Sequence, residues 1–139
     1  MASMDSYGEI VAAIARIMAA VDRQDREAFR DGWSEDVDFQ VVFFGQPPVS
    51  VTGRDTLVNR FTANWNGEAS ALRHQVGAVE VTTHDENHAS ARFYCTYVRT
   101  GPVVALAGMG EYEDDLVRDA DGRWRVAKRR HVFLTPLAH

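Results

Sequence analysis

The sequence predicts an α+β protein, a cone-shaped and strongly curved antiparallel sheet with N-terminal helices packed on one face. Apolar residues recur every three or four positions through much of the first half of the chain, which is the period of helices. From Leu72 to the end they alternate with polar residues, which is the period of strands. Helices that come first and strands that follow form a helical layer on one sheet face. A long sheet curled round helices leaves a cone open at one end, where such folds hold ligands.

The N-terminal segment predicts an amphipathic helix, because its apolar residues repeat at three- and four-residue steps: Ile10, Ile14, Ile17, Met18 and Val21. Ser6 and Glu9 have the spacing of a capping box. Asp25 is expected to cap a shorter second helix, in which Phe29 and Trp33 lie four residues apart on one side. The chain therefore opens with a pair of helices.

A strand, a loop and a third helix are expected next. Residues 37–44 are mostly β-branched or aromatic, and the Gly-Gln-Pro-Pro run at 45–48 ends this strand. Thr52 is expected to cap the third helix, along which Leu57, Phe61 and Trp65 repeat every four residues. The Asn-Gly pair at 66–67 supplies the left-handed ending that helices often use.

Four strand-like runs fill the second half, at about 72–82, 88–99, 103–118 and 123–134. Short turns separate them and predict an antiparallel meander. In the last hairpin, Leu116 is expected to face Trp124, which puts five side chains on one face: Tyr112, Asp114, Val126, Lys128 and Arg130. Buried charge needs a partner, so this register predicts an ion pair between Asp114 and either Lys128 or Arg130.

Length and composition fit a single domain over residues 1–139, since 45% of the residues are hydrophobic and a chain of this length buries a real core. The net charge of −5 leaves no basic surplus for nucleic acid or an anionic membrane. No run approaches the roughly 20 apolar residues of a membrane span. Cys95 is the only cysteine, and no cationic start precedes an apolar run, so a cytoplasmic protein without disulfides is expected.

No cofactor or metal is expected from the motifs. The five histidines show no ligand spacing with one another, and His84 and His88 flank a turn. The chain also lacks a glycine-rich phosphate loop and a nucleophile elbow.

Four stretches resemble SnoaL-like proteins of the nuclear transport factor 2-like superfamily: AAVDRQDREAF at 19–29, GRD at 53–55, RHQVGAVEV at 73–81 and GEYEDDLVRDADGRWRVAKRR at 110–130. The order of elements matches as well, and the likeness spans nearly the whole chain. This superfamily includes scytalone dehydratase, steroid isomerase, bile-acid dehydratase, epoxide hydrolases and polyketide cyclases, alongside members without chemistry. The resemblance implies the cone-shaped fold, whereas function depends on a few pocket side chains.

Two candidate catalytic residues follow from the resemblance. His74 matches the pocket histidine of the dehydratase-type relatives, where an imidazole shuttles a proton near neutral pH. Asp22 matches their aspartate after the first helix, which orients that histidine or acts as an acid or base. The structural alternatives are a strand histidine satisfied by a neighbour and an aspartate that caps the second helix beside Asp25. Where these relatives carry a catalytic tyrosine, this chain has Ile17.

Tyr94, Tyr97 or Tyr112 can supply a phenol from another wall. Strand parity favours Tyr97, because Tyr94 points the other way unless a bulge shifts the register. Arg130 resembles an arginine of some relatives that would hold a substrate oxyanion or carboxylate; the alternative is the ion pair with Asp114. Five further aromatic residues are expected either to line the cavity or to form ordinary core: Trp33, Phe39, Phe43, Phe61 and Trp65.

The resulting hypothesis is a cofactor-independent acid–base enzyme, a dehydratase, isomerase or cyclase, acting on a hydrophobic oxygenated molecule such as a polyketide or steroid-like compound. The first alternative is a non-catalytic small-ligand-binding or accessory protein of the same fold. A second is a subunit that works through its exposed sheet face, and a homodimer is compatible with all of these.

Overall fold

The computed structural model describes residues 4–137 and confirms the α+β class. The elements in chain order are α1 (Met4–Arg23), α2 (Arg26–Asp31), β1 (Trp33–Val42), β2 (Val49–Thr52), α3 (Arg54–Phe61), β3 (Leu72–Val76), β4 (Glu80–Asp85), β5 (His88–Arg99), β6 (Ala105–Arg118) and β7 (Trp124–Phe133).

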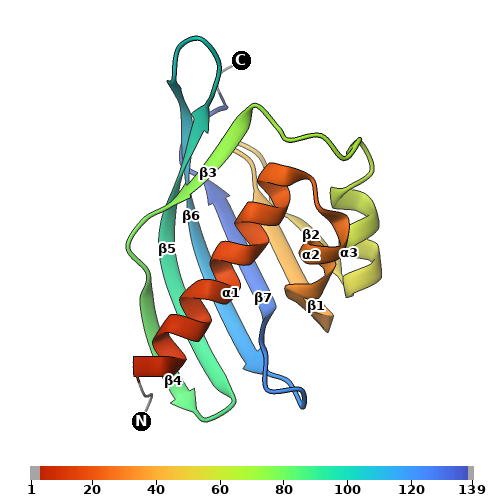
Figure 1. The fold of residues 1–139 in the computed structure, drawn as a ribbon, viewed down its shortest axis with the longest axis vertical. Coiled ribbons are helices and arrows are strands. Elements are labelled where there is room, and N and C mark those ends of the chain that lie inside the picture. Colours follow the sequence, from red (N-terminus) through yellow and green to blue (C-terminus); the bar gives the residue numbers. More distant parts are fainter. Residues whose placement is uncertain (1–3, 138–139) are drawn as a thin grey trace.

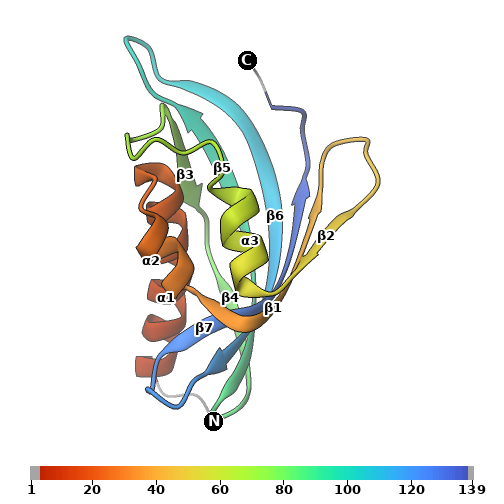
Figure 2. The same ribbon diagram turned by 90° about the vertical axis from the view of Figure 1, so that its right-hand side faces the viewer.

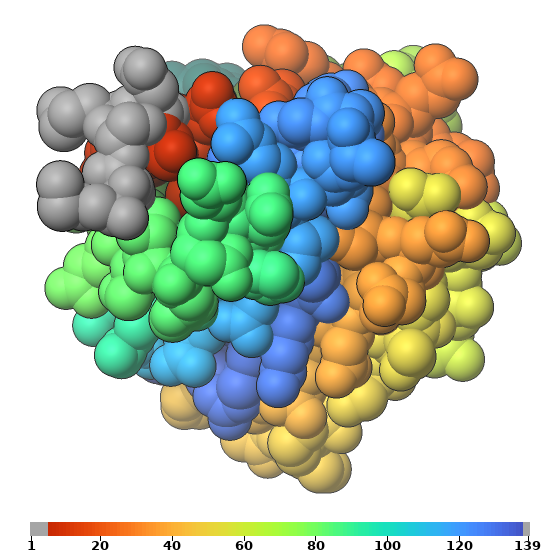
Figure 3. Space-filling model, turned by 90° about the horizontal axis from the view of Figure 1, so that it is seen from below, coloured from red at the N-terminus to blue at the C-terminus, as the bar shows by residue number. Residues whose placement is uncertain are grey.

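The strands form one strongly curved sheet in the order β2-β1-β7-β6-β5-β3, and β4 also pairs with β5. All neighbouring pairs are antiparallel except β1 and β7, which run parallel; β2, α3 and β3 to β6 lie between these two strands in the chain. The helices lie together on one face, with α1 running obliquely across the sheet (Figure 1). Turned by 90°, the sheet bends round them (Figure 2). At one end the β4–β5 turn, in green, and the β6–β7 turn, in blue, lie next to each other (Figure 3).

Helix α1 packs a continuous apolar face on the sheet, as its periodicity predicted. Ile10, Ile14 and Ile17 are at most 1% exposed, and full burial of one such side chain contributes about 1.5–3 kcal/mol. The capping box was wrong, because Ser6 already lies inside the helix. A tertiary contact holds this first part, since the Tyr7 hydroxyl donates a hydrogen bond to the backbone carbonyl of Val79 at 3.1 Å.

The second helix is capped as predicted but is shorter. Asp25 accepts a hydrogen bond from the backbone N–H of Ala28 at 3.1 Å. Trp33 is not helical; it begins β1, where it pairs with Val126 of β7. The backbone N–H of Val126 donates to the carbonyl of Gly32 at 3.0 Å, so sheet pairing overrides the four-residue spacing of the aromatic residues.

The third helix also differs from the prediction at both ends. It begins after Gly53, whose φ of 91° is in the left-handed region, and not at Thr52, which belongs to β2. It ends at Phe61, so Trp65 lies in the following turn. Trp65 nevertheless contacts Phe29 and Phe61 edge-on, at ring-centroid distances of 5.5 and 6.0 Å.

Two register features change which side chains face inward. The run predicted at 72–82 is two strands, β3 and β4, which pair with different parts of β5. In the last hairpin Leu116 pairs with Val126 and Asp115 with Lys128, so Ala127 is an extra residue on β7. The predicted facing of Leu116 and Trp124 was therefore wrong. Beyond this bulge the parity of β7 reverses, and every following side chain lies on the face opposite to the one expected.

Candidate functional site

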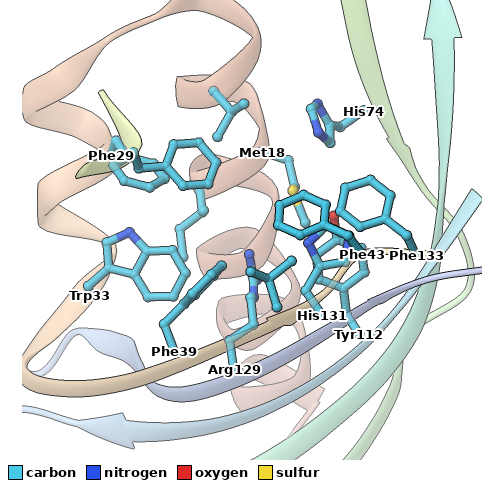
Figure 4. A pocket seen from close by; sticks show the side chains of 14 residues that line it. Met18, Phe29, Trp33, Phe39, Phe43, His74, Tyr112, Arg129, His131 and Phe133 are labelled. Carbon is cyan, nitrogen blue, oxygen red and sulfur yellow. The ribbon is translucent and has the colours of Figure 1, made fainter. Parts of the chain in front are cut away.

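A cavity of about 340 Å³ lies between α1 and the sheet, bounded also by α2, α3 and β1 (Figure 4). This volume is in the range of small-molecule sites. Its wall is mainly apolar and aromatic, with a few polar groups. The lining residues are Ile17, Met18, Val21, Phe29, Trp33, Phe39, Val41, Phe43, Phe61, His74, Tyr112, Arg129, His131 and Phe133.

The aromatic wall agrees in part with the sequence analysis. Trp33, Phe39 and Phe61 line the cavity, and Trp33 meets Phe39 edge-on at a centroid distance of 5.8 Å. Trp65 does not line it; it supports Phe29 and Phe61 from behind. Aromatic pairs in this geometry contribute roughly 0.5–1.5 kcal/mol beyond the area that they bury.

Asp22 and His74 form a hydrogen-bonded pair at the cavity wall. Nδ1 of His74 lies 2.7 Å from Oδ1 of Asp22, and the backbone N–H of His74 lies 3.1 Å from both carboxylate oxygens. Each side chain is only 14% exposed. Asp22 therefore orients the imidazole and does not cap α2, which Asp25 does alone. A carboxylate that accepts from Nδ1–H leaves Nε2 of the neutral imidazole with its lone pair.

The fold brings these two residues together from 52 positions apart. Asp22 lies in the last turn of α1, and its backbone carbonyl accepts a hydrogen bond from the N–H of Ser70 at 2.9 Å, just before β3. On β3, His74 pairs with Tyr97 of β5. The end of α1 is thus tied to the beginning of β3, which sets the carboxylate against the imidazole.

Arg129 and Asp114 form a buried ion pair beside the same cavity. Arg129 Nε and Nη2 each donate to one carboxylate oxygen of Asp114 at 2.7 Å, and the two residues are 3% and 1% exposed. The guanidinium carbon lies 5.0 Å from the ring centroids of both Trp33 and Tyr112. Burial raises the pKa of Asp114, and the cation of Arg129 counteracts this. Within residues 4–137, no group accepts a hydrogen bond from Arg129 Nη1.

Arg130 does not reach the cavity, contrary to the sequence analysis. It is exposed on the opposite sheet face, where its Nε donates to Oε1 of Gln40 at 3.1 Å. Lys128 is exposed as well. The predicted buried ion pair exists, but Asp114 pairs with Arg129, because after the bulge at Ala127 the odd-numbered side chains of β7 face inward.

Tyr97 faces inward as strand parity predicted, and Tyr94 on the same strand is 55% exposed. The Tyr97 hydroxyl does not line the cavity; it lies 2.5 Å from Nε2 of His131 and 3.3 Å from the hydroxyl of Tyr112. Burial raises the pKa of both phenols above the ordinary value. Neither phenol is therefore ionised near neutral pH.

His131 is a cavity residue that the sequence analysis missed. Its ring stacks on Tyr112 at a centroid distance of 4.0 Å and contacts Phe133 at 4.4 Å. Burial, followed by the charge of Arg129 and the nearby His74, lowers the pKa of His131 to about 3. The imidazole is therefore neutral. The Lys-Arg-Arg-His run at 128–131 was the signal in the sequence that could have pointed to His131. Which side chains of this run face inward depends on the bulge at Ala127, which the sequence pattern does not reveal.

No group of three or more histidine, cysteine, aspartate or glutamate side chains within residues 4–137 is arranged to hold a metal ion. In the same part of the chain, no helix is both long and apolar enough to cross a membrane.

The fold and cavity match a known family. The family model for the SnoaL-like domain matches residues 2–130, so the chain belongs to the SnoaL-like domain family. The resemblance seen in the sequence is thereby confirmed. Among curated proteins, none matches this sequence.

Solved structures show the same fold. A protein of unknown function with a cystatin-like fold from Nostoc punctiforme has a TM-score of 0.81 and 21% identity, over 97% of this chain and 96% of that one. A ketosteroid isomerase-like protein from Erwinia carotovora atroseptica has a TM-score of 0.71 and 20% identity, over 96% and 100%. A Catenulispora acidiphila protein in complex with S-DNPA has a TM-score of 0.73 and 25% identity, over 94% and 95%.

Proposed function

We propose that this protein is a cofactor-independent acid–base enzyme, a dehydratase, isomerase or cyclase, for a hydrophobic oxygenated molecule such as a polyketide or steroid-like compound. The observation that carries the proposal is the Asp22–His74 hydrogen bond at the wall of an aromatic cavity. Relatives support it, since one neighbour is described as ketosteroid isomerase-like and another holds a small ligand.

In this proposal, His74 is the general base and Asp22 its positioning residue. Asp22 accepts from Nδ1–H and holds the tautomer in which Nε2 takes a proton from a substrate carbon or hydroxyl. The imidazolium that forms is stabilised by the same carboxylate, and the proton then returns to the substrate at another atom or protonates a leaving hydroxyl. General acid–base catalysis of this kind contributes roughly 10²–10⁴-fold to the rate.

Arg129 is the proposed group that stabilises negative charge on the substrate oxygen. Its Nε and Nη2 are held by Asp114, and its plane lies between two aromatic rings, so the remaining Nη1 hydrogens are fixed before substrate binds. Donors that are preorganised in a water-poor site stabilise a developing oxyanion, and loss of one costs roughly 10²–10³ in rate.

The test is turnover of two probes, an aromatic β-hydroxy ketone for dehydration and a β,γ-unsaturated steroid ketone for isomerisation. We expect His74→Ala to lose roughly 10²–10⁴-fold in kcat on the probe that the wild type converts. Asp22→Asn should retain substrate binding and lose kcat. His84→Ala is the matched control, because His84 lies on the exposed part of β4. Unchanged turnover in His74→Ala would refute the assignment.

One observation favours the alternative of a non-catalytic ligand-binding protein. Ile17 lines the cavity where dehydratase-type relatives carry a tyrosine, and the hydroxyls of Tyr97 and Tyr112 are bonded to each other or to His131. Ligand affinity that survives loss of both His74 and Asp22, with no product from either probe, would support this alternative.

The proposal also includes a cytoplasmic homodimer that binds neither nucleic acid nor membranes. Self-association would use the outer face of the sheet, where Tyr94 and Met109 are 55% and 37% exposed. On that face Arg92 lies near Glu111 and Glu113, which offers charges of both signs to a second copy. A strictly monomeric mass by light scattering would exclude the dimer.

A further inference from the structure

The hydrogen bond between Tyr97 and His131 spans three strands. Tyr97 comes from β5 and His131 from β7, and β6 lies between them. On β6, Gly110 pairs with Cys95 on one side and with Phe133 on the other. The tyrosine side chain therefore reaches over the backbone of β6 to meet the imidazole at 2.5 Å.

Gly110 is required for this bond. A Cβ on Gly110 would overlap the Tyr97 hydroxyl and lie only 2.9 Å from Nε2 of His131. Because Tyr97 and His131 are both buried and their rings have little room to move aside, any side chain at position 110 would push the pair apart. The glycine leaves a space on the inner sheet face that the hydrogen bond occupies.

The two nitrogens of His131 differ in their surroundings. Nε2 is occupied by Tyr97, whereas Nδ1 has no hydrogen-bond partner among residues 4–137. Nδ1 is also not fully buried, and His131 lines the cavity. A neutral imidazole donates through one nitrogen and accepts through the other. A phenol is the stronger acid of this pair, so we expect Tyr97 to donate to Nε2 and the imidazole proton to lie on Nδ1.

We propose that His131 donates a hydrogen bond from Nδ1 to an oxygen of the ligand, and that Tyr97 is the positioning residue that selects this tautomer. Arg129 and His131 are successive inward-facing residues of β7, with the outward-facing Arg130 between them, and both line the cavity. Together they recognise two acceptor oxygens, as in a 1,3-dicarbonyl or a hydroxy ketone. Naming this substrate class rests on the proposed function; the donor role of His131 does not.

The first experiment needs no ligand. Nitrogen-15 NMR of the histidine rings distinguishes a protonated from an unprotonated ring nitrogen, and we expect His131 to carry its proton on Nδ1 throughout pH 5–8. Tyr97→Phe and Gly110→Ala should both shift the Nε2 resonance, while Tyr94→Phe, on the exposed side of the same strand, should not. An Nε2–H tautomer in the wild type would overturn the proposal, whether or not the variants fold.

The second experiment measures binding of 2-acetylnaphthalene against 2-ethylnaphthalene, which has the same shape without the oxygen. We expect the wild type to prefer the ketone by roughly 3–10-fold, the value of one hydrogen bond. His131→Asn keeps a donor at the Nδ1 position and should retain the preference. His131→Gln replaces the Nε2 side only and should lose it. Equal preference in both variants would overturn the donor role.

These outcomes separate this proposal from the proposed function. Loss of ketone preference in His131→Gln with no turnover of any probe by the wild type supports the donor and refutes the enzyme. Turnover that depends on His74 together with an Nε2–H tautomer at His131 supports the enzyme and refutes the donor.

Discussion

The neutral state of His131 predicts that folding stability falls in mild acid. The pKa of this imidazole is about 3 in the folded protein, against 6.5 for an ordinary histidine. Below pH 6.5 the unfolded chain binds a proton that the folded protein excludes. The contribution of His131 is therefore fully present above pH 6.5, is lost progressively as the pH falls, and levels off only near pH 3.

The expected magnitude follows from the two pKa values. Each pH unit between them costs about 1.36 kcal/mol, so the 1.5 units from pH 6.5 to pH 5 remove about 2 kcal/mol of unfolding free energy. The side chain is 8% exposed, so solvent screening reduces this value little. A loss of about 2 kcal/mol is large, because the free energy of unfolding of a domain is only about 5–15 kcal/mol.

The assay is urea unfolding of the wild type and of His131→Asn at pH 7 and pH 5. The wild type should lose about 2 kcal/mol more than the variant over this interval, because carboxylate contributions are shared and cancel in the difference. His84→Asn, a change at an exposed histidine, should follow the wild type. Equal pH dependence in the wild type and His131→Asn would show that His131 is not held neutral.

Three stability predictions follow, all by urea unfolding at pH 7. Asp114→Asn should cost roughly 3–5 kcal/mol, because it leaves the buried Arg129 cation without its partner, whereas Asp115→Asn, at an exposed neighbour, should cost much less. Asp25→Ala removes the cap of α2 and should cost roughly 0.5–2 kcal/mol; no change would mean that the cap is dispensable. Phe29→Ala should cost roughly 3–5 kcal/mol, since this fully buried ring contacts three other rings, and a cost below 1 kcal/mol would contradict that packing.

The features predicted correctly are those encoded by short-range periodicity. A helix repeats every 3.6 residues and a strand every two, so the buried face of α1 and the inward side of Tyr97 can be read from spacing alone. Element ends were less accurate, as Trp33 and Trp65 show. Their aromatic spacing resembled a helix, but pairing of Trp33 with β7 and the early end of α3 followed from contacts with distant residues.

The candidate site shows the same division. His74 and Asp22 were named from the sequence by resemblance, but their 2.7 Å contact depends on how the end of α1 meets β3. Arg130 was chosen and Arg129 was missed because one extra residue, Ala127, reverses the parity of β7.

The sequence by itself determined the α+β class, the amphipathic face of α1, the inward alternation of β5 and the family, because each depends on the order and local spacing of residues. Only the tertiary structure decided that Arg129 and His131 face the cavity and that Tyr97 crosses Gly110 to reach His131. The physical reason is that a bulge and a close approach between strands are set by pairing across the whole sheet, and local periodicity carries no information about them.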